Sequence, residues 1–202
     1  MIGIVSYGLG NVSAFLNIYN DLNVPAKQIF CPSDFDQVTH IVLPGVGSFD
    51  WAMQCLDSSG LRPALNYAVL KESKPILGIC VGMQIMATRS DEGTLGGLGW
   101  IQGEVKKFDI RLLSSLTHLP HMGWNDVDLT AHPLFADITN PRFYFLHSYF
   151  FSPFDQANIL CTTKYCSEFS SGIFSGNIFG LQFHPEKSHH SGIQLLKNFS
   201  LI

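Results

Sequence analysis

Residues 75–84 read PILGICVGMQ, an apolar run that ends in a cysteine held between two glycines. Such a short, continuous apolar segment is typical of a strand that is buried on both faces of a parallel sheet. Gly78 and Gly82 flank Cys80, and small residues there permit the sharp strand-to-helix turn that presents a nucleophile. The stretch therefore predicts a buried strand, a tight turn at Cys80 and a helix directly after it. A second interpretation stays open, in which Cys80 is a packed apolar thiol without a chemical role.

Strands and helices are expected to alternate in the first half of the chain. The sequence predicts strands at residues 2–5, 26–30 and 40–43, and helices at about 11–22 and 61–72, the first of them capped by Asn11. Such alternation indicates βαβ units and a parallel sheet, whose ligands gather beyond the carboxyl ends of the strands. Cys80 and the loop 44–47, with the sequence PGVG, both lie at such ends. We therefore expect them to share a site.

The second half of the chain is expected to be richer in strands, some of them antiparallel. Segments with many Phe, Tyr and Ile residues predict strands at 100–108, 142–147, 159–163, 172–174 and 178–183. Residues 90–99 predict a glycine-rich loop, and residues 109–123 an irregular polar segment. A last helix should be capped by Ser188 or Ser191 and should bury Ile193, Leu195, Leu196 and Phe199.

The composition predicts one α/β domain over residues 1–202. Hydrophobic residues make up 46% of the chain and charged residues only 14%, well below the roughly 25% charged share of an average domain. This low charge predicts a large interface with a partner, with sequence drift as the weaker explanation. The net charge of −4 and the lack of a Lys/Arg cluster argue against nucleic-acid binding.

Other classes of ligand and location find no support in the sequence. No apolar run approaches the roughly 18 residues that cross a membrane, and no signal sequence precedes residues 2–5, so we expect a cytoplasmic protein without membrane attachment. The five cysteines are odd in number and include no C-x-x-C pair, which predicts free thiols. Residues 8–11, GLGN, lack the third glycine of a dinucleotide loop, and we expect no cofactor.

Residues 118–125, with the sequence HLPHMGWN, allow more than one interpretation. His118 and His121 are three apart, yet no suitably spaced carboxylate or cysteine accompanies them, so no metal site is expected. Met122 and Trp124 are residue types enriched in the cores of interfaces, and they predict an anchor for a partner. Packing of Trp124 in the core is an equally weighted alternative.

Residues 182–186, QFHPE, supply a base and a carboxylate. His184 and Glu186 are two apart at a predicted strand end, where an extended backbone would point both side chains to one face. With Cys80 they form a candidate triad, in which Cys80 attacks, His184 accepts and returns the proton, and Glu186 fixes the tautomer. The segment alone is a weak signal. Together with G-x-C-x-G and the PGVG loop it becomes a strong one.

Three motifs together resemble those of the triad, or class I, glutamine amidotransferases: GICVGMQ (78–84), PGVG (44–47) and QFHPE (182–186). A finer match, through SYGLGN, PGVGSF, PHMGWN, HSY and QFHPEKS, is to the glutaminase subunits of imidazole glycerol phosphate synthases. These segments keep the family's order over nearly the whole chain. The resemblance implies a three-layer α/β fold, with a mostly parallel central sheet, flanking helices and a smaller antiparallel sheet.

The resemblance also implies roles for single residues. Cys80 would take up the carboxamide of L-glutamine as a γ-glutamyl thioester and release ammonia, and water would then regenerate the enzyme. The oxyanion would be held by the backbone N–H of Val81 and by an amide of the loop at Val46 and Gly47. The positions that hold the glutamine amide, amine and carboxylate in the family are matched by Gly45, Gly47, Gln84, Glu92, Ser148 and Tyr149.

In the family this subunit docks on a (β/α)8 barrel synthase subunit of the HisF type and sends ammonia through the barrel. Positions on that docking face are matched by Pro120, Met122, Trp124 and Lys187. The leading hypothesis is therefore a glutaminase subunit that serves histidine biosynthesis. A paralogous branch supplies ammonia for amidino sugars of surface polysaccharides, and the segments GLGWIQG, KKF and HSYF lean weakly towards it. A non-catalytic regulatory module is a third hypothesis, against which the intact triad argues.

Overall fold

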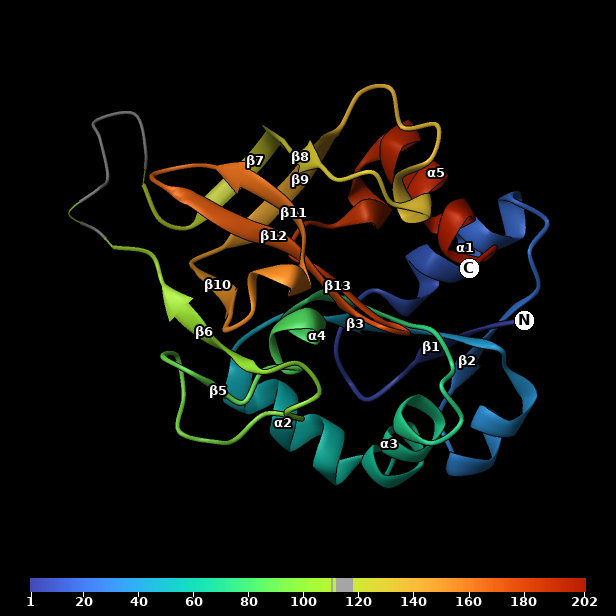
Figure 1. Ribbon diagram of the computed structural model, residues 1–202. Helices are drawn as coiled ribbons and strands as arrows, with labels where there is room; N and C mark the ends of the chain where they lie inside the picture. Colours follow the sequence, from blue (N-terminus) through green and yellow to red (C-terminus); the bar gives the residue numbers. More distant parts are fainter. Residues whose placement is uncertain (110, 112–117) are drawn as a thin grey trace.

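The computed structural model describes residues 1–109, 111 and 118–202. Its centre is an eight-stranded sheet in the order β2-β1-β3-β4-β13-β12-β11-β8 (Figure 1). The parallel part comprises β1 (Ile2–Val5), β2 (Ala26–Ile29), β3 (His40–Gly45), β4 (Ile76–Cys80) and β13 (Ile178–Leu181). The antiparallel part adds β12 (Glu168–Ser175), β11 (Ile159–Lys164) and β8 (Asp128–Leu129). The mostly parallel central sheet is thereby confirmed.

Helices cover both faces of this sheet (Figure 1). On one face lie α1 (Val12–Asp21) and α5 (His189–Phe199), and on the other α2 (Phe49–Ser58) and α3 (Arg62–Leu70). The four-residue helix α4 (Val81–Gln84) follows β4 directly. Short 3-10 helices occur at η1 (Pro32–Gln37), η3 (Pro133–Phe135), η4 (Gln156–Asn158) and η5 (Pro185–Lys187). The result is the three-layer α/β architecture that the family resemblance implies.

Side chains of the central strands alternate between two core clusters, one under each helical layer. Ile41 and Leu43 of β3 pack in the cluster that contains residues of α2 and α3, whereas Val42 packs with residues of α1 and α5. In β4, Ile76 joins the first cluster and Leu77 the second. Because both faces of these strands are buried, their sequences are continuously apolar. The prediction of a doubly buried strand before Cys80 is confirmed.

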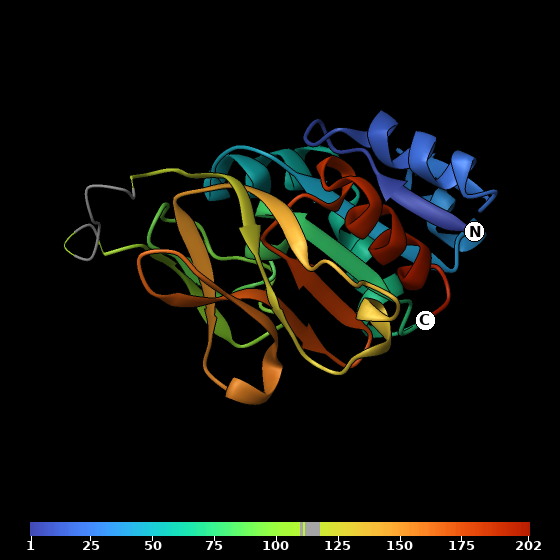
Figure 2. The same ribbon diagram turned by 90° about the horizontal axis from the view of Figure 1, so that it is seen from above.

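Two smaller sheets lie beside the central one (Figure 2). In the first, β6 (Gly103–Lys107) pairs antiparallel with β10 (Tyr149–Pro153) and parallel with β5 (Arg89–Ser90). The second is the antiparallel pair of β7 (His121–Asp126) and β9 (Arg142–His147). The smaller antiparallel sheet that the resemblance implies is therefore present as two short sheets rather than one.

Some details of the fold differ from the sequence prediction. Helix α2 and strands β7 and β10 are absent from that prediction, and β7 replaces part of the predicted irregular segment 109–123. Residues 110 and 112–117 of that segment lie outside the described residues. The expected burial of Ile193 is wrong, because this side chain is 37% exposed and lies about 100° around α5 from the buried Gly192. None of the helices in the described part of the chain has the length and apolarity that spanning a membrane requires.

Candidate active site

Cys80 occupies a strained turn between β4 and α4. It is the last residue of the strand and adopts φ 56° and ψ −114°, a conformation that costs a non-glycine residue about 1–3 kcal/mol. The two flanking glycines leave room for this turn. A Cβ on Gly78 would lie 2.7 Å from the carbonyl oxygen of Gly82, and a Cβ on Gly82 would collide with the carbonyl of Leu43. The predicted tight turn at Cys80 is confirmed, with a steric reason for each glycine.

His184 and Glu186 form a buried pair. Nδ1 of His184 lies 2.8 Å from Oε1 of Glu186, and the two side chains are only 2% and 4% exposed. The expected extended backbone is wrong, because Pro185–Lys187 form the 3-10 helix η5 and the carboxylate reaches the imidazole by a turn of the chain. The predicted pairing itself is present. Since Nδ1 is used by Glu186, Nε2 is the nitrogen available to Cys80.

Charge at His184 is controlled by its neighbours. Burial alone would lower the pKa of this imidazole, but hydrogen bonds to Cys80 and Glu186 outweigh burial and raise the pKa to about 9. His184 therefore holds a proton at neutral pH and can deliver it to a leaving group at the sulfur.

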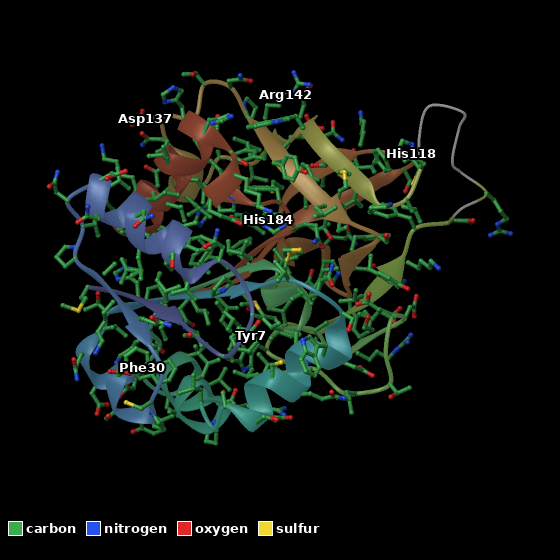
Figure 3. All side chains as sticks on the ribbon, turned by 180° about the vertical axis from the view of Figure 1, so that it is seen from behind. Tyr7, Phe30, His118, Asp137, Arg142 and His184 are labelled. Carbon is green, nitrogen blue, oxygen red and sulfur yellow. The ribbon has the colours of Figure 1, made fainter. Side chains whose placement is uncertain are left out.

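Figure 3 shows His184 near the centre of the molecule, whereas Asp137 and Arg142 lie at its margin.

A cavity of about 140 Å³ lies at Cys80, which is one of its lining residues. Its lining residues are Val46, Gly47, Cys80, Gln84, Glu92, Leu146, His147, Ser148, Tyr149, His184 and Lys187. Most of the predicted site residues are therefore brought together. Glu186 lies behind His184, and Gly45 and Val81 flank Cys80 without lining the cavity. Leu146 and His147 are not among the predicted site residues, although His147 is the first residue of the HSY motif and Leu146 directly precedes it.

Two side chains of the cavity are fixed by the protein itself. Gln84 donates from Nε2 to the carbonyl of Tyr149, at 3.0 Å, and to Oε1 of Gln182, at 2.9 Å. Oε2 of Glu92 accepts from the backbone N–H of Phe49 at 2.8 Å, at the start of α2. Gln84 and Glu92 are thus already oriented before a ligand binds. This orientation reduces the conformational entropy that the two side chains lose on binding.

The PGVG loop lies directly against the Cys80 turn. Gly45, the last residue of β3, pairs in register with Cys80, and a Cβ at this position would lie 2.6 Å from the backbone nitrogen of Gly82. Val46 is 44% exposed, and Gly47 has φ +100°, a conformation that glycine adopts without strain. The PGVG loop and the start of α4 at Val81 therefore flank Cys80 from two elements.

An apolar surface adjoins the cavity on the outer side of β7 and β9. It consists of Met122, Trp124, Tyr144 and Leu146, and we call it the outer face. The register pairs Met122 with Leu146 and Trp124 with Tyr144, so the four side chains form two neighbouring rows. Met122 is 60% and Trp124 39% exposed, which makes the alternative of a core-packed Trp124 wrong. Nζ of Lys187 lies 5.7 Å from the centre of the Tyr144 ring, between the outer face and the cavity.

Within residues 1–109, 111 and 118–202, no three His, Cys, Asp or Glu side chains gather in a way that could hold a metal ion. His118 is exposed and His121 is buried, so these two predicted neighbours point to different environments. In Figure 3, His118 lies at the edge of the molecule, far from His184.

Comparison with known proteins agrees with this geometry. A family model described as "Glutamine amidotransferase class-I" matches residues 11–202. The chain is 46% identical to the imidazole glycerol phosphate synthase subunit HisH of Leptospira interrogans, over 99% of each chain. It is 49% identical to the subunit of the same name of Bdellovibrio bacteriovorus, over 100% of each chain.

Solved structures share the fold at much lower identity. One crystal structure of a glutamine amidotransferase superposes with a TM-score of 0.73 at 13% identity, covering 100% of this chain and 99% of the other. A glutamine amidotransferase of Thermotoga maritima gives a TM-score of 0.63 at 18% identity, covering 94% and 77%. Because the family model covers residues 11–202 and the two HisH relatives are 46% and 49% identical over nearly the full length, the chain belongs to the class-I glutamine amidotransferase family and, within it, to the group of HisH subunits.

Proposed function

We propose that this chain is the glutaminase subunit of an imidazole glycerol phosphate synthase, which hydrolyses L-glutamine to glutamate and ammonia. One observation carries the proposal. Cys80 stands on a strained turn in front of a cavity, beside a buried histidine whose other nitrogen is held by Glu186 at 2.8 Å. A nucleophile, a base and a group that orients the base are the parts that covalent acyl transfer needs.

The reaction proceeds in two halves. His184 takes the thiol proton of Cys80 and Sγ attacks the carboxamide carbon; His184 gives this proton to the departing nitrogen as the C–N bond breaks, which releases ammonia and leaves a γ-glutamyl thioester. Water next loses a proton to His184 while its oxygen attacks the thioester, and breakage of the C–S bond frees glutamate and Cys80. Backbone N–H groups of Val81 and of the loop at Val46 and Gly47 hold the oxyanion in both halves. The substrate's polar groups are held by Gly45, Gly47, Gln84, Glu92, Ser148 and Tyr149.

The outer face is the proposed docking surface for a (β/α)8 barrel cyclase subunit of the HisF type. The relatives at 46% and 49% identity are named as subunits of a synthase, which supports a partner of this kind. Pro120, Met122, Trp124 and Lys187 are exposed, and Leu146 belongs both to the outer face and to the cavity lining. A partner seated there would close the cavity against water and receive the ammonia. We place this complex in the cytoplasm.

Neither of the other two hypotheses gains a supporting observation. The names of the relatives favour the histidine branch over the branch that makes amidino sugars. The bonded His184–Glu186 pair beside Cys80 is unexpected for a regulatory module without catalysis. The experiment that follows distinguishes all three hypotheses.

Ammonia release from L-glutamine tests the proposed function. The chain is mixed with a candidate barrel cyclase subunit, and wild type is compared with Cys80→Ala and with Cys166→Ala as a matched thiol control. The proposal requires that Cys80→Ala abolish ammonia release and that Cys166→Ala leave it intact, since Cys166 lies outside the cavity. Unchanged ammonia release in Cys80→Ala would overturn it. Activity that responds to an amidino-sugar precursor instead would move the chain to the polysaccharide branch.

A further inference from the structure

Two buried histidines connect strand β7 with the cavity. Nδ1 of His121 lies 2.9 Å from Nε2 of His147, across the antiparallel register in which the two residues are paired. Nδ1 of His147 lies 2.8 Å from the carbonyl oxygen of Tyr149, and both His147 and Tyr149 line the cavity. On its far side, Nε2 of His121 lies 3.2 Å from Nδ2 of Asn125. The mechanism described above uses neither His121 nor Asn125.

The partners at the two ends fix where the protons sit. The amide of Asn125 is oriented by its neighbours, because Oδ1 accepts from the N–H of Asp126 and Nδ2 donates to the carbonyl of Lys164. Nδ2 therefore also donates to Nε2 of His121, which leaves the proton of this neutral imidazole on Nδ1. That proton is donated to Nε2 of His147, whose own proton is then on Nδ1.

The other end of the chain demands the same arrangement. The carbonyl of Tyr149 can only accept, so Nδ1 of His147 must donate to it. Each hydrogen bond is therefore donated in the same direction, from Asn125 to His121, from His121 to His147, and from His147 to the carbonyl of Tyr149. Burial lowers the pKa of His121 to about 4 and that of His147 to about 3, in keeping with two neutral rings at neutral pH.

The hydrogen bonds continue from the Tyr149 carbonyl to the nucleophile. This oxygen also accepts from Nε2 of Gln84, and Gln84 donates in turn to Oε1 of Gln182. Nε2 of Gln182 lies 3.7 Å from Sγ of Cys80. Gln84 and Gln182 are 4% and 0% exposed, so these bonds are shielded from water and are correspondingly strong.

We propose that His121 and Asn125 are positioning residues of the glutaminase site, which act through His147 to hold the Tyr149 carbonyl and the Gln84 amide where glutamine binds. The inference rests on the proposed function, because it names that function's binding pocket. His121 is well suited to this task. Its ring stacks on the rings of Phe145 and Tyr165, with ring centroids 4.6 Å and 3.9 Å away, so the imidazole is held in one plane.

A pair of substitutions separates positioning from mere packing. His121→Phe fills the space and keeps the stacking but removes the N–H to His147, whereas His121→Asn is smaller and keeps an N–H near the place of Nδ1. Positioning predicts that KM for glutamine rises roughly 5- to 100-fold in His121→Phe, with a smaller change in kcat, and that His121→Asn recovers most of this loss. Packing alone predicts the reverse order. Kinetics are measured with the barrel subunit present.

Tyr165→Phe is the matched control for these variants. It keeps the ring stacked on His121 and removes only the hydroxyl, which bonds the backbone of His118 outside the hydrogen-bond chain. Its KM should equal that of wild type. A wild-type KM in His121→Phe, or a larger rise in His121→Asn than in His121→Phe, would overturn the inference while leaving the glutaminase function intact.

A spectroscopic readout tests the proton arrangement without any activity. Imidazole ¹⁵N shifts of selectively labelled protein should show His121 and His147 as neutral Nδ1–H tautomers between about pH 6 and 8. An Nε2–H tautomer at either ring, or a charged ring at neutral pH, would contradict the inference. If wild-type protein released no ammonia, the proposed function would fail, whereas this measurement would still decide whether the hydrogen-bond chain exists.

Discussion

His184 and Glu186 meet on a single 3-10 turn, with Nδ1 of the histidine 2.8 Å from Oε1 of the carboxylate. The second oxygen, Oε2, is buried and has no hydrogen-bond partner within the described residues. Glu186 is therefore held by the imidazole as much as the imidazole is held by Glu186. The two side chains act as one unit that keeps Nε2 turned to Cys80.

Replacement of the carboxylate should therefore disable the base. In Glu186→Gln the volume is kept, but the amide no longer stabilises an imidazolium and can impose the wrong tautomer on His184. We expect kcat for glutamine hydrolysis to fall roughly 100- to 10,000-fold, with folding retained by circular dichroism. Glu168→Gln, which changes an exposed carboxylate of β12, is the control and should keep wild-type kcat. A fall of less than about tenfold in Glu186→Gln would speak against the triad.

The steric reason for Gly82 gives a stability prediction. A methyl group there collides with the backbone carbonyl of Leu43, which cannot move without breaking the parallel pairing of β3 and β4. Gly82→Ala should lower the free energy of unfolding by about 1–3 kcal/mol and abolish activity. Gly96→Ala meets its nearest atom, the Thr88 carbonyl oxygen, only at 3.9 Å and should change stability little. Equal stabilities of the two variants in urea unfolding would refute this account of the turn.

The buried histidine pair predicts a loss of stability on mild acidification. Burial lowers the pKa of His121 to about 4 and of His147 to about 3, while an unfolded histidine titrates near about 6.5. Between these values the unfolded chain binds more protons than the folded one, so the free energy of unfolding falls as the pH drops from about 6.5 to 4. Each histidine contributes a slope of up to about 1.4 kcal/mol per pH unit in this window.

Urea unfolding at about pH 7, 6 and 5 measures this slope. Burial also lowers the pKa of His40 and His132, which adds to the loss with the same sign. His184 acts in the opposite direction, because its pKa is raised to about 9 and its contribution disappears only as the pH rises through that value. His121→Phe should flatten the acid slope. A slope identical to that of wild type would show that His121 is not buried as a neutral ring.

Docking of a partner on the outer face should depend on its exposed aromatic residue and on the adjacent cation. Trp124→Ala and Lys187→Ala should each weaken binding of the barrel subunit roughly 10- to 100-fold, since an aromatic anchor carries much of the energy of an interface and the Lys187 ammonium lies over the Tyr144 ring of the outer face. Tyr67→Ala is the control, because this tyrosine is 61% exposed on α3 at the opposite face of the sheet. Titration by calorimetry measures the Kd values. Equal affinities for all three variants would exclude the outer face as the interface.

Local patterns in the sequence predict the centre of the molecule well. The apolar run before Cys80 and the glycines around it specify a doubly buried strand and a sharp turn, because each effect acts within a few residues. His184 and Glu186 are likewise found from their spacing, although the chain joins them by a 3-10 turn rather than an extended strand. In motifs of this kind, the local sequence is sufficient to predict which side chains lie together.

Features that depend on contacts between residues far apart in the sequence cannot be predicted from local patterns. Strand β7 buries His121 and exposes Met122 and Trp124, the reverse of the usual pattern for a half-buried strand. Its pairing with β9 joins residues 26 positions apart, His121 and His147, and only this pairing shows why a histidine is buried there. The role of His147 in the cavity therefore becomes visible only in three dimensions.

The covalent intermediate on Cys80 is the most direct test of the account. Wild-type chain with its barrel partner is mixed with L-glutamine, quenched in acid and mapped by peptide mass spectrometry. We predict a γ-glutamyl adduct on the peptide that contains Cys80, formed and lost at the rate of ammonia release, and none in Cys80→Ala. Steady ammonia release without an adduct on Cys80, or an adduct on another cysteine in its place, would contradict the central claim.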